Sequence, residues 1–298
     1  MRRLFGSLIL ALAFYGSANA QLLYKISGNG LKSSSYIVGT YHLAPAAFAD
    51  EIKGMSEAFA AVEQVYGEVD MSKAHSSQLA MMSAMMLPEG KYVSDMFSDE
   101  EMERINAYVR KNMGMDLNNS MLREQLGRMR PSVLAMQLGV LQYIKVTPNF
   151  NPNALIDDHF QKEARKRGLT VGGFETVEFQ MELLYGEVSE DDERKALLKL
   201  VDDNETVLKE MQAMTDAYFS FDMEGIKTIT FNSLESGDMT HEQFSKMITD
   251  RNHNWVEAMP DIMADKPTLF VVGAGHLPGD EGVLELLKAQ GYKVKAVK

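Results

Sequence analysis

The chain has 298 residues, of which 45% are apolar and 24% charged, so it is long enough to bury a sizeable core as one or two domains. Its formal net charge of −12 argues against nucleic acid or an anionic membrane surface as a partner, because nothing would offset the repulsion from phosphate groups. The absence of cysteine rules out disulfides and thiol chemistry.

Residues 1–20 differ from the rest of the chain. Two arginines precede an apolar segment of about a dozen residues, which ends in Ala18-Asn19-Ala20, and this order is typical of a cleaved secretory signal peptide. The apolar segment is shorter than the ~20 residues that a membrane-spanning helix needs. We therefore expect residues 21–298 to be the mature chain, to have no membrane span, and to reside in the periplasm or outside the cell.

Helical and strand patterns follow one another along the mature chain. Gly28-Asn29-Gly30 is a strong hairpin signal, and Ser98 with Glu101 forms a capping box. We expect strands at 22–28, 34–42, 65–70, 169–175, 268–276 and 292–297, and helices at 50–64, 99–114, 131–146, 153–168, 240–259 and 280–291. The strand–helix–strand order at the start favours parallel pairing. The prediction is one α/β domain over 21–298, with a central mixed sheet and helical insertions.

A methionine-rich segment lies between the first strands and the long helices. Its spacing suits one face of a helix, so we expect methionines that fill a core or an interface rather than bind a metal. A groove for peptides is the alternative, because methionine-rich surfaces adapt to different partners. The methionines are Met71, Met81, Met82, Met85 and Met86.

Two similar motifs lie more than two hundred residues apart. In YIVGTYHL (36–43) and FVVGAGHL (270–277), an apolar run is followed by a glycine, two residues, a histidine and a leucine. A single G-x-x-H is weak evidence, but ligands of open α/β sheets bind beyond the carboxyl ends of the strands, where His42 and His276 are expected. Gly39 and Gly273 would allow a sharp turn and a close approach of substrate to the backbone.

Glu68 and Glu175 each end another predicted strand, so the same edge would carry two imidazoles and two carboxylates. Two histidines and one glutamate suit a catalytic divalent metal that keeps an open position for water. The second carboxylate would orient a ligand or act as general base. Each residue taken alone is equally well explained as a satisfied polar group at a strand end.

These residues and their surroundings resemble the TraB/PrgY/GumN family, which includes the Tiki proteins, over nearly the whole mature chain. The resemblance implies an α/β core shared with erythromycin-esterase-like and haem-binding ChaN-like proteins. For Tiki-like members it implies a metal-dependent endopeptidase whose ligands correspond here to His42, His276 and Glu68. The resemblance is carried by YIVGTYH, VYGEVD, ALIDDHFQKEARKRGLTVGGFETVEFQ, DRNHNW and FVVGAGHLPGDEGVLELLKAQGYKV.

Two further family elements match in part. The family's LET…Q element appears as residues 174–180, with phenylalanine in place of leucine, and its RN element matches Arg251-Asn252. Arg251 is expected to pair with Glu175 or Glu68 or to bind a substrate carboxylate, and a purely structural ion pair is equally open. Asn252 would be a hydrogen-bonding partner in that network. Tyr41 either donates to an oxyanion or, as we prefer, packs as an aromatic.

The leading hypothesis is a periplasmic metal-dependent hydrolase, preferably a peptidase, that uses a metal-activated water. His42, His276 and Glu68 would hold zinc, manganese or cobalt, and Glu68, Glu175 and Arg251 would serve catalysis. Two alternatives are a metal-independent esterase with a histidine base and a non-catalytic protein that binds a peptide or haem, for which Tyr41 and His42 are available ligands. The sequence does not define the peptide or small-molecule substrate, the metal or the oligomeric state.

Overall fold

The computed structural model describes residues 21–74, 77–146, 150–151, 154–186, 188–236 and 239–298. The predicted signal peptide, residues 1–20, lies outside this part of the chain. No helix within these ranges has the length and apolar character that crossing a membrane requires.

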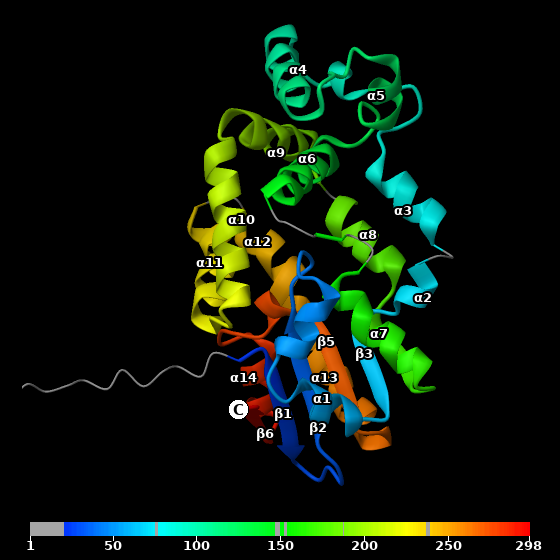
Figure 1. The fold of residues 1–298 in the computed structure, drawn as a ribbon, viewed down its shortest axis with the longest axis vertical. Helices are drawn as coiled ribbons and strands as arrows, with labels where there is room; N and C mark the ends of the chain where they lie inside the picture. Colours follow the sequence, from blue (N-terminus) through cyan, green and yellow to red (C-terminus); the bar gives the residue numbers. More distant parts are fainter. Residues whose placement is uncertain (1–20, 75–76, 147–149, 152–153, 187, 237–238) are drawn as a thin grey trace, which may run out of the picture.

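Six strands in the described ranges form one mixed sheet, in the order β4-β3-β5-β2-β1-β6. β4, β3, β5 and β2 run parallel to one another, whereas β1 is antiparallel to both β2 and β6 (Figure 1). This confirms the predicted mixed α/β class. β2 and β3 are parallel as expected, but β5 lies between them. The strands are β1 (Leu23–Gly28), β2 (Ser35–Thr40), β3 (Gln64–Val69), β4 (Thr170–Glu175), β5 (Thr268–Gly273) and β6 (Tyr292–Ala296).

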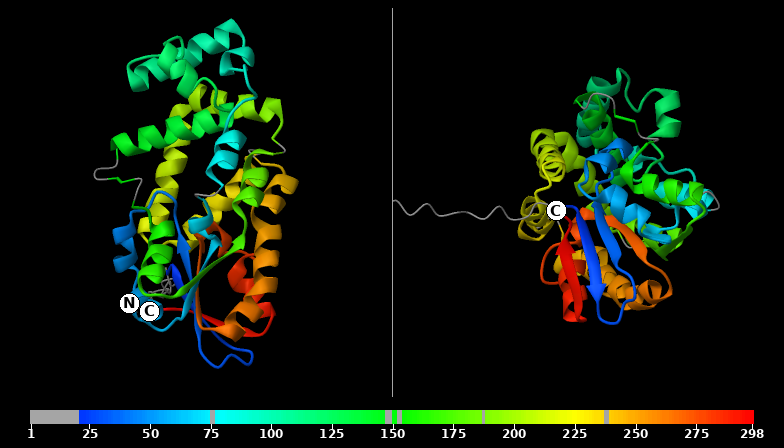
Figure 2. Two further views of the ribbon diagram at one scale, coloured as in Figure 1. Left: turned by 90° about the vertical axis from the view of Figure 1, so that its right-hand side faces the viewer. Right: turned by 60° about the horizontal axis from the view of Figure 1, so that its bottom comes forward.

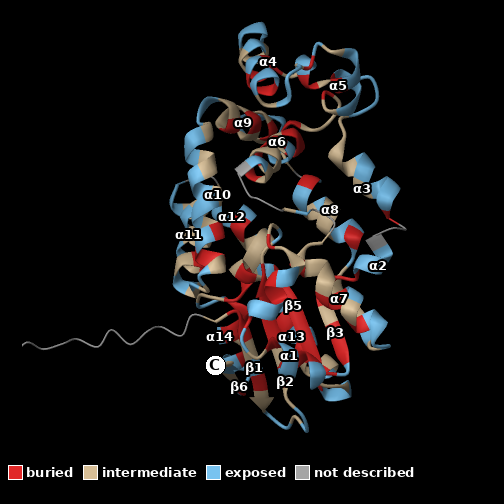
Figure 3. Cartoon of the chain, in the orientation of Figure 1, coloured by how far each residue is buried: buried red, intermediate tan, exposed pale blue. Residues whose placement is uncertain are grey.

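Alternate side chains of the strands enter two separate cores, one on each face of the sheet. Val38 and Val271 pack on one face with Phe160 of α7, while Ile37 and Phe270 pack on the other face with residues of α13 and α14. This is the alternation expected of strands that are covered on both faces. Figure 3 shows the buried residues concentrated in the strands.

Helices cover the sheet and extend the molecule beyond one of its ends. The helix expected over 50–64 is divided into a 3-10 turn and a short α1, which begins after Gly54 at φ +76°. The helices predicted over 99–114, 131–146, 153–168 and 280–291 have ends within three residues of those bounds, and Ser98 and Glu101 form the expected capping box of α4. The helix predicted over 240–259 is instead divided into α12, a π-helical turn and α13, and it ends at Asp265. The helices are α1 (Met55–Ala60), α2 (Met71–Ala74), α3 (Gln78–Met85), α4 (Asp99–Met113), α5 (Ser120–Gln125), α6 (Pro131–Val146), α7 (Ile156–Lys166), α8 (Val177–Tyr185), α9 (Glu190–Asp202), α10 (Asn204–Phe219), α11 (Met223–Glu235), α12 (His241–Phe244), α13 (Asp250–Asp265) and α14 (Val283–Ala289).

The helical half, which includes α4, α5, α6 and α9, has a core of its own around Ile105, Leu134 and Leu197. It lies at the end of the molecule opposite the β1–β2 turn (Figures 1 and 2). Because β2 starts at that turn, the carboxyl ends of β2 and its parallel partners point toward the helical half.

The methionine-rich segment differs from the expectation of a core element. None of the residues of α3 is buried, and Met71 and Met82 are exposed. The helix has no dominant apolar face, which explains why these methionines do not fill a core, and their expected place in an interface stays a prediction.

Candidate active site

Four parallel strands bring the predicted residues to one edge of the sheet. Thr40 of β2 is paired with Gly273 of β5, and Val69 of β3 is paired with Glu175 of β4. His42 and His276 follow the ends of β2 and β5. Glu68 is the second-last residue of β3, and Glu175 is the last residue of β4. The strand order thus places the two carboxylates and His276 next to one another, with His42 at the far side of β5.

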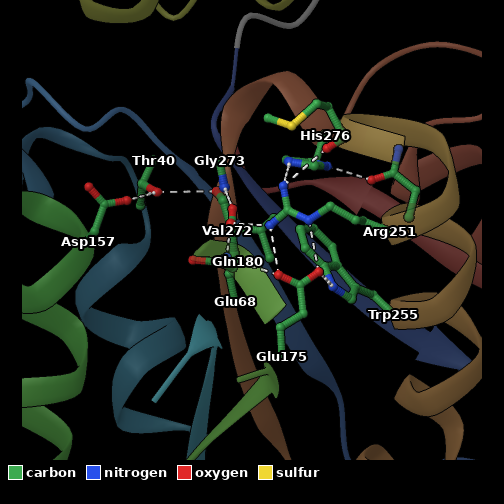
Figure 4. Close-up of polar contacts among 12 residues, drawn as sticks. Thr40, Glu68, Asp157, Glu175, Gln180, Arg251, Trp255, Val272, Gly273 and His276 are labelled. Carbon is green, nitrogen blue, oxygen red and sulfur yellow. Dashed lines mark hydrogen bonds and ion pairs between the residues drawn. The ribbon is translucent and has the colours of Figure 1, made fainter. Parts of the chain in front are cut away.

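Arg251, at the start of α13, connects the two carboxylates (Figure 4). Its Nε and Nη2 atoms lie 2.8 and 2.9 Å from the two oxygens of Glu175, which is the bidentate geometry that guanidinium and carboxylate groups favour. Nη2 also donates to Glu68 Oε2 at 2.6 Å. The side chains of Arg251 and Glu175 are each only 7% exposed, so this is a buried ion-pair network.

Glu68 is held by three donors. Its Oε1 accepts from the amide of Gly273 at 2.8 Å, and its Oε2 accepts from Arg251 and, at 3.2 Å, from Gln180. Burial on its own would raise the pKa of Glu68, but His276, Arg251 and the Gly273 amide together lower this pKa to about 2. The carboxylate is therefore ionised at neutral pH.

His276 is buried and neutral. Asn252 donates its amide group to the carbonyl of Glu281 at 2.8 Å, which turns its oxygen toward His276 Nδ1 at 2.7 Å. The amide oxygen only accepts, so the network assigns the proton to Nδ1 and leaves a lone pair on Nε2. Burial lowers the pKa of His276 to about 4, which agrees with a neutral ring. The Nε2 lone pair faces Arg251 Nη1 at 3.2 Å.

His42 has a different environment, with 76% of its side chain exposed. Its Nδ1 lies 3.1 Å from Asp157 of α7, and the other oxygen of Asp157 accepts from Thr40 at 2.5 Å. The hydrogen bond with Asp157 raises the pKa of His42 to about 9, so the ring is protonated at neutral pH. Its Nε2 has no hydrogen-bond partner among the residues that the structure describes and faces solvent.

The two motif glycines have different reasons to be glycine. A Cβ on Gly39 would lie 2.8 Å from a methyl group of Leu277 and 3.0 Å from the backbone of Ala274, so close packing excludes a side chain there. A Cβ on Gly273 would lie 3.3 Å from Glu68 Oε1 and 3.5 Å from the His276 ring. Glycine at 273 therefore keeps open the space between Glu68 and His276.

The remaining predicted residues also have defined positions. The hydroxyl of Tyr41 lies 3.2 Å from that of Thr215 and its ring packs on Tyr218, as a packing aromatic would. His253 forms an exposed ion pair with Glu281. It takes no part in the Arg251 network.

Two residues of the site were not expected from the sequence. Trp255 donates its Nε1 to Glu175 at 2.8 Å, and its spacing of four from Arg251 on a helix was the available signal. Asp157 lies in the first turn of α7, where an acidic residue is ordinarily explained by the helix dipole. Its pairing with His42 depends on how α7 packs against the sheet, which no local pattern records.

The expected metal site was compared with the donors that the structure provides. No group of three or more His, Asp or Glu side chains within the described ranges is arranged to hold a metal ion. The lone pairs of His276 and of Glu68 Oε2 face Arg251, and His42 Nδ1 faces Asp157. As arranged, the residues His42, His276 and Glu68 do not fit a divalent metal.

A groove of about 840 Å³ reaches the network from the side of α8 and α13. Its lining combines exposed apolar residues such as Phe179 and Leu184 with the acidic residues Glu182, Glu242 and Asp250, and it includes Arg251 itself. A cavity of about 920 Å³ among Met82, Met96 and Arg128 contains none of the site residues. Of the residues of the candidate site, Arg251 is the one that lines the groove.

Comparison with known proteins agrees with the resemblance in the motifs. The metalloprotease TIKI homolog of Nematostella vectensis is 22% identical over 89% of this chain, and the human metalloprotease TIKI1 is 23% identical over 88%. The aligned region spans 65% and 59% of the lengths of these two relatives. No solved structure matches the chain. The sequence model of the TraB/PrgY/gumN family matches residues 22–296, and the chain therefore belongs to the TraB/PrgY/gumN family.

Proposed function

We propose that the chain is a hydrolase of peptide bonds with its active site at the carboxyl edge of β2, β5, β3 and β4. The observation that carries the proposal is the exposed His42–Asp157 pair at the edge that also holds Glu68 in a buried ion-pair network. The similarity to two metalloproteases supports the class of reaction. No step of the proposal passes through a metal, because the candidate ligands do not fit one as arranged.

His42 acts as the proton donor. The protonated ring offers its Nε2–H to the carbonyl oxygen of the scissile bond, so it stabilises the negative charge that develops on that oxygen. The same proton later passes to the leaving amine, while Asp157 keeps the ring oriented and charged. A positioned acid of this kind contributes about 10²- to 10⁴-fold to the rate.

Glu68 acts as the acceptor for the proton of the attacking water. Oε1 carries one hydrogen bond, from Gly273, and borders the space that a side chain at position 273 would fill. Glu68 is 17% exposed whereas Glu175 is 7% exposed and held by Arg251 and Trp255, so Glu68 is the better placed of the two. A carboxylate with so low a pKa is a weak base, and we expect the larger share of the rate enhancement from His42.

Substrate is expected to lie in the groove that includes Arg251. The exposed apolar residues would take apolar side chains, whereas the charged lining residues have both signs, because Lys246 and Arg251 lie among Glu182, Glu242 and Asp250. We therefore propose extended peptides with apolar residues as substrates. The signal-peptide pattern of residues 1–20 supports action in the periplasm or outside the cell, and sequencing the N-terminus of the protein from a periplasmic fraction tests this location.

The activity is tested with a peptide library of mixed composition, with cleavage followed by mass spectrometry. We expect cleavage by the wild-type chain, and its loss in His42→Ala and Glu68→Gln. His253→Ala is the matched control, because it removes another exposed, ion-paired histidine that does not touch the network. Undiminished cleavage by His42→Ala would contradict the proposal. Peptides that bind tightly but are recovered intact would identify a binding protein instead.

A further inference from the structure

The guanidinium of Arg251 lies where the candidate metal ligands converge. It has five N–H groups, and five acceptors surround it. Nε donates to Glu175 Oε1, and Nη2 donates to Glu175 Oε2 and Glu68 Oε2. Nη1 donates to the carbonyl of Met247 at 3.1 Å and to His276 Nε2 at 3.2 Å. Every donor of this side chain is thus matched, which is the arrangement expected of a permanent structural partner.

Three of these acceptors are the atoms that a divalent metal would need. A metal bound by histidine and glutamate requires the imidazole lone pair and a carboxylate oxygen within about 2.0–2.2 Å of one point. Here the lone pair of His276 Nε2 and the Oε2 atoms of Glu68 and Glu175 all receive an N–H of Arg251 instead. The ion and the guanidinium therefore compete for the same donor atoms.

Arg251 is also held by two residues that are not candidate metal ligands. Its guanidinium carbon lies 4.8 Å from the centre of the Trp255 ring, and the Met247 carbonyl fixes its Nη1. A guanidinium does not lose its proton in proteins, so no change of pH within the stable range removes the competing charge. A metal would have to displace a buried side chain that is bound at every donor.

We propose that Arg251 is the resident cation of this site and that it takes the place of a divalent metal between Glu68, Glu175 and His276. The wild-type chain then binds no zinc, manganese or cobalt through these residues, unlike a protein whose function depends on such an ion. Removal of Arg251 leaves one imidazole and two carboxylates without their cationic partner, and it frees His276 Nε2 of its contact with that guanidinium, which gives a donor set that zinc favours. The inference rests on the proposed function only for the location of the site, since metal binding is measured without a substrate.

The test compares metal content and thermal stability among five forms of the full chain. Each form is treated with EDTA, incubated with Zn²⁺, Mn²⁺ or Co²⁺, separated from free ions by gel filtration and analysed by elemental mass spectrometry. We expect wild type and His276→Ala to retain the same small background. We expect Arg251→Ala to retain about one zinc ion per chain above that background, and the Arg251→Ala/His276→Ala double variant to lose it.

Zinc is further expected to raise the melting temperature of Arg251→Ala but not that of wild type, because only the variant has free ligands. Arg251→Lys is the matched control: it keeps a positive charge at the site and should bind no additional metal. The proposal is overturned if wild type retains stoichiometric metal that His276→Ala loses, or if Arg251→Ala gains none. An Arg251→Ala chain that stays unfolded with or without zinc also counts against it. Peptide cleavage is assayed separately, so failure of the proposed hydrolase leaves these results unchanged.

Discussion

Arg251 and Trp255 lie one turn apart on α13 and donate to the same atom, Glu175 Oε1, each at 2.8 Å. The ring of Trp255 also lies beneath the guanidinium, so one helical turn supplies both the cation and its platform. α13 thereby fixes the position of the end of β4, which is one of the two edge strands of the sheet. The network joins α13 to β3, β4 and β5 at the point where catalysis is proposed.

The first prediction concerns the stability that this network provides. Arg251→Met, measured with EDTA present, is expected to lower the free energy of unfolding by about 3–5 kcal/mol, because two largely buried carboxylates lose the guanidinium that pairs with both of them. Arg104→Met is the matched control, since Arg104 pairs with Asp202 where both side chains are more than 40% exposed. That loss should stay below about 1 kcal/mol. Equal losses in the two variants, measured by urea unfolding, would contradict the importance assigned to burial.

The second prediction concerns acid. The pKa of Glu68 falls from its ordinary value of 4.5 to about 2 on folding, so its contribution to stability is present above about pH 4.5 and is lost as the pH falls toward 2. This contribution is on the order of 3 kcal/mol. In the metal-free protein, the stability difference between wild type and Glu68→Gln should therefore shrink between pH 5 and 3, as followed by urea unfolding. A difference that does not change with pH would show that Glu68 titrates normally.

Local signals in the sequence predicted the elements well. The turn at Gly28-Asn29-Gly30 is confirmed by positive φ values at all three residues, and the capping box at Ser98 is present. These features depend on neighbouring residues alone. The placement of β5 between β2 and β3 depends on packing of the whole sheet, and no pattern near those strands predicted it.

The candidate site was predictable where it follows strand ends and unpredictable where it depends on helices. Glu68, Glu175 and His276 lie together because parallel strands end at one edge. His42 was expected to share a metal ion with His276, but His42 instead pairs with Asp157 of α7. The residue types matched a metal site, whereas the hydrogen-bond network, with Arg251 at its centre, does not.

The third prediction tests the role of His42. The pair with Asp157 raises the pKa of His42 from 6.5 to about 9, so Asp157→Asn should bring it back toward 6.5. Because His42 acts as an acid, kcat/KM of wild type should persist until the pH approaches 9, and that of Asp157→Asn should already decline near 7.

Since 76% of the His42 side chain is exposed, solvent screens the effect of the His42–Asp157 pair on the stability of the fold. That stabilisation is present below about pH 6.5 and is lost as the pH rises through 9.

The titration of His42 itself is checked by NMR of the histidine ring protons, which requires no substrate. His253 provides an internal reference, because Asp157→Asn leaves its partner Glu281 in place. An unchanged His42 titration in Asp157→Asn would refute the pairing, and a shifted titration with an unchanged activity profile would refute the role as acid.

The last prediction concerns the groove beside Arg251. Phe179 is 45% exposed in its lining, and Phe179→Ala removes apolar area that a bound peptide would cover without touching the ion-pair network. We expect KM to rise roughly tenfold while kcat stays unchanged, because contacts made equally in the bound and transition states affect binding alone. Met121→Ala is the matched control, since Met121 is an exposed apolar residue of α5 that lies outside the groove. A fall in kcat with constant KM would place the effect of Phe179 at the reacting bond, and substrate would then have to enter from another side.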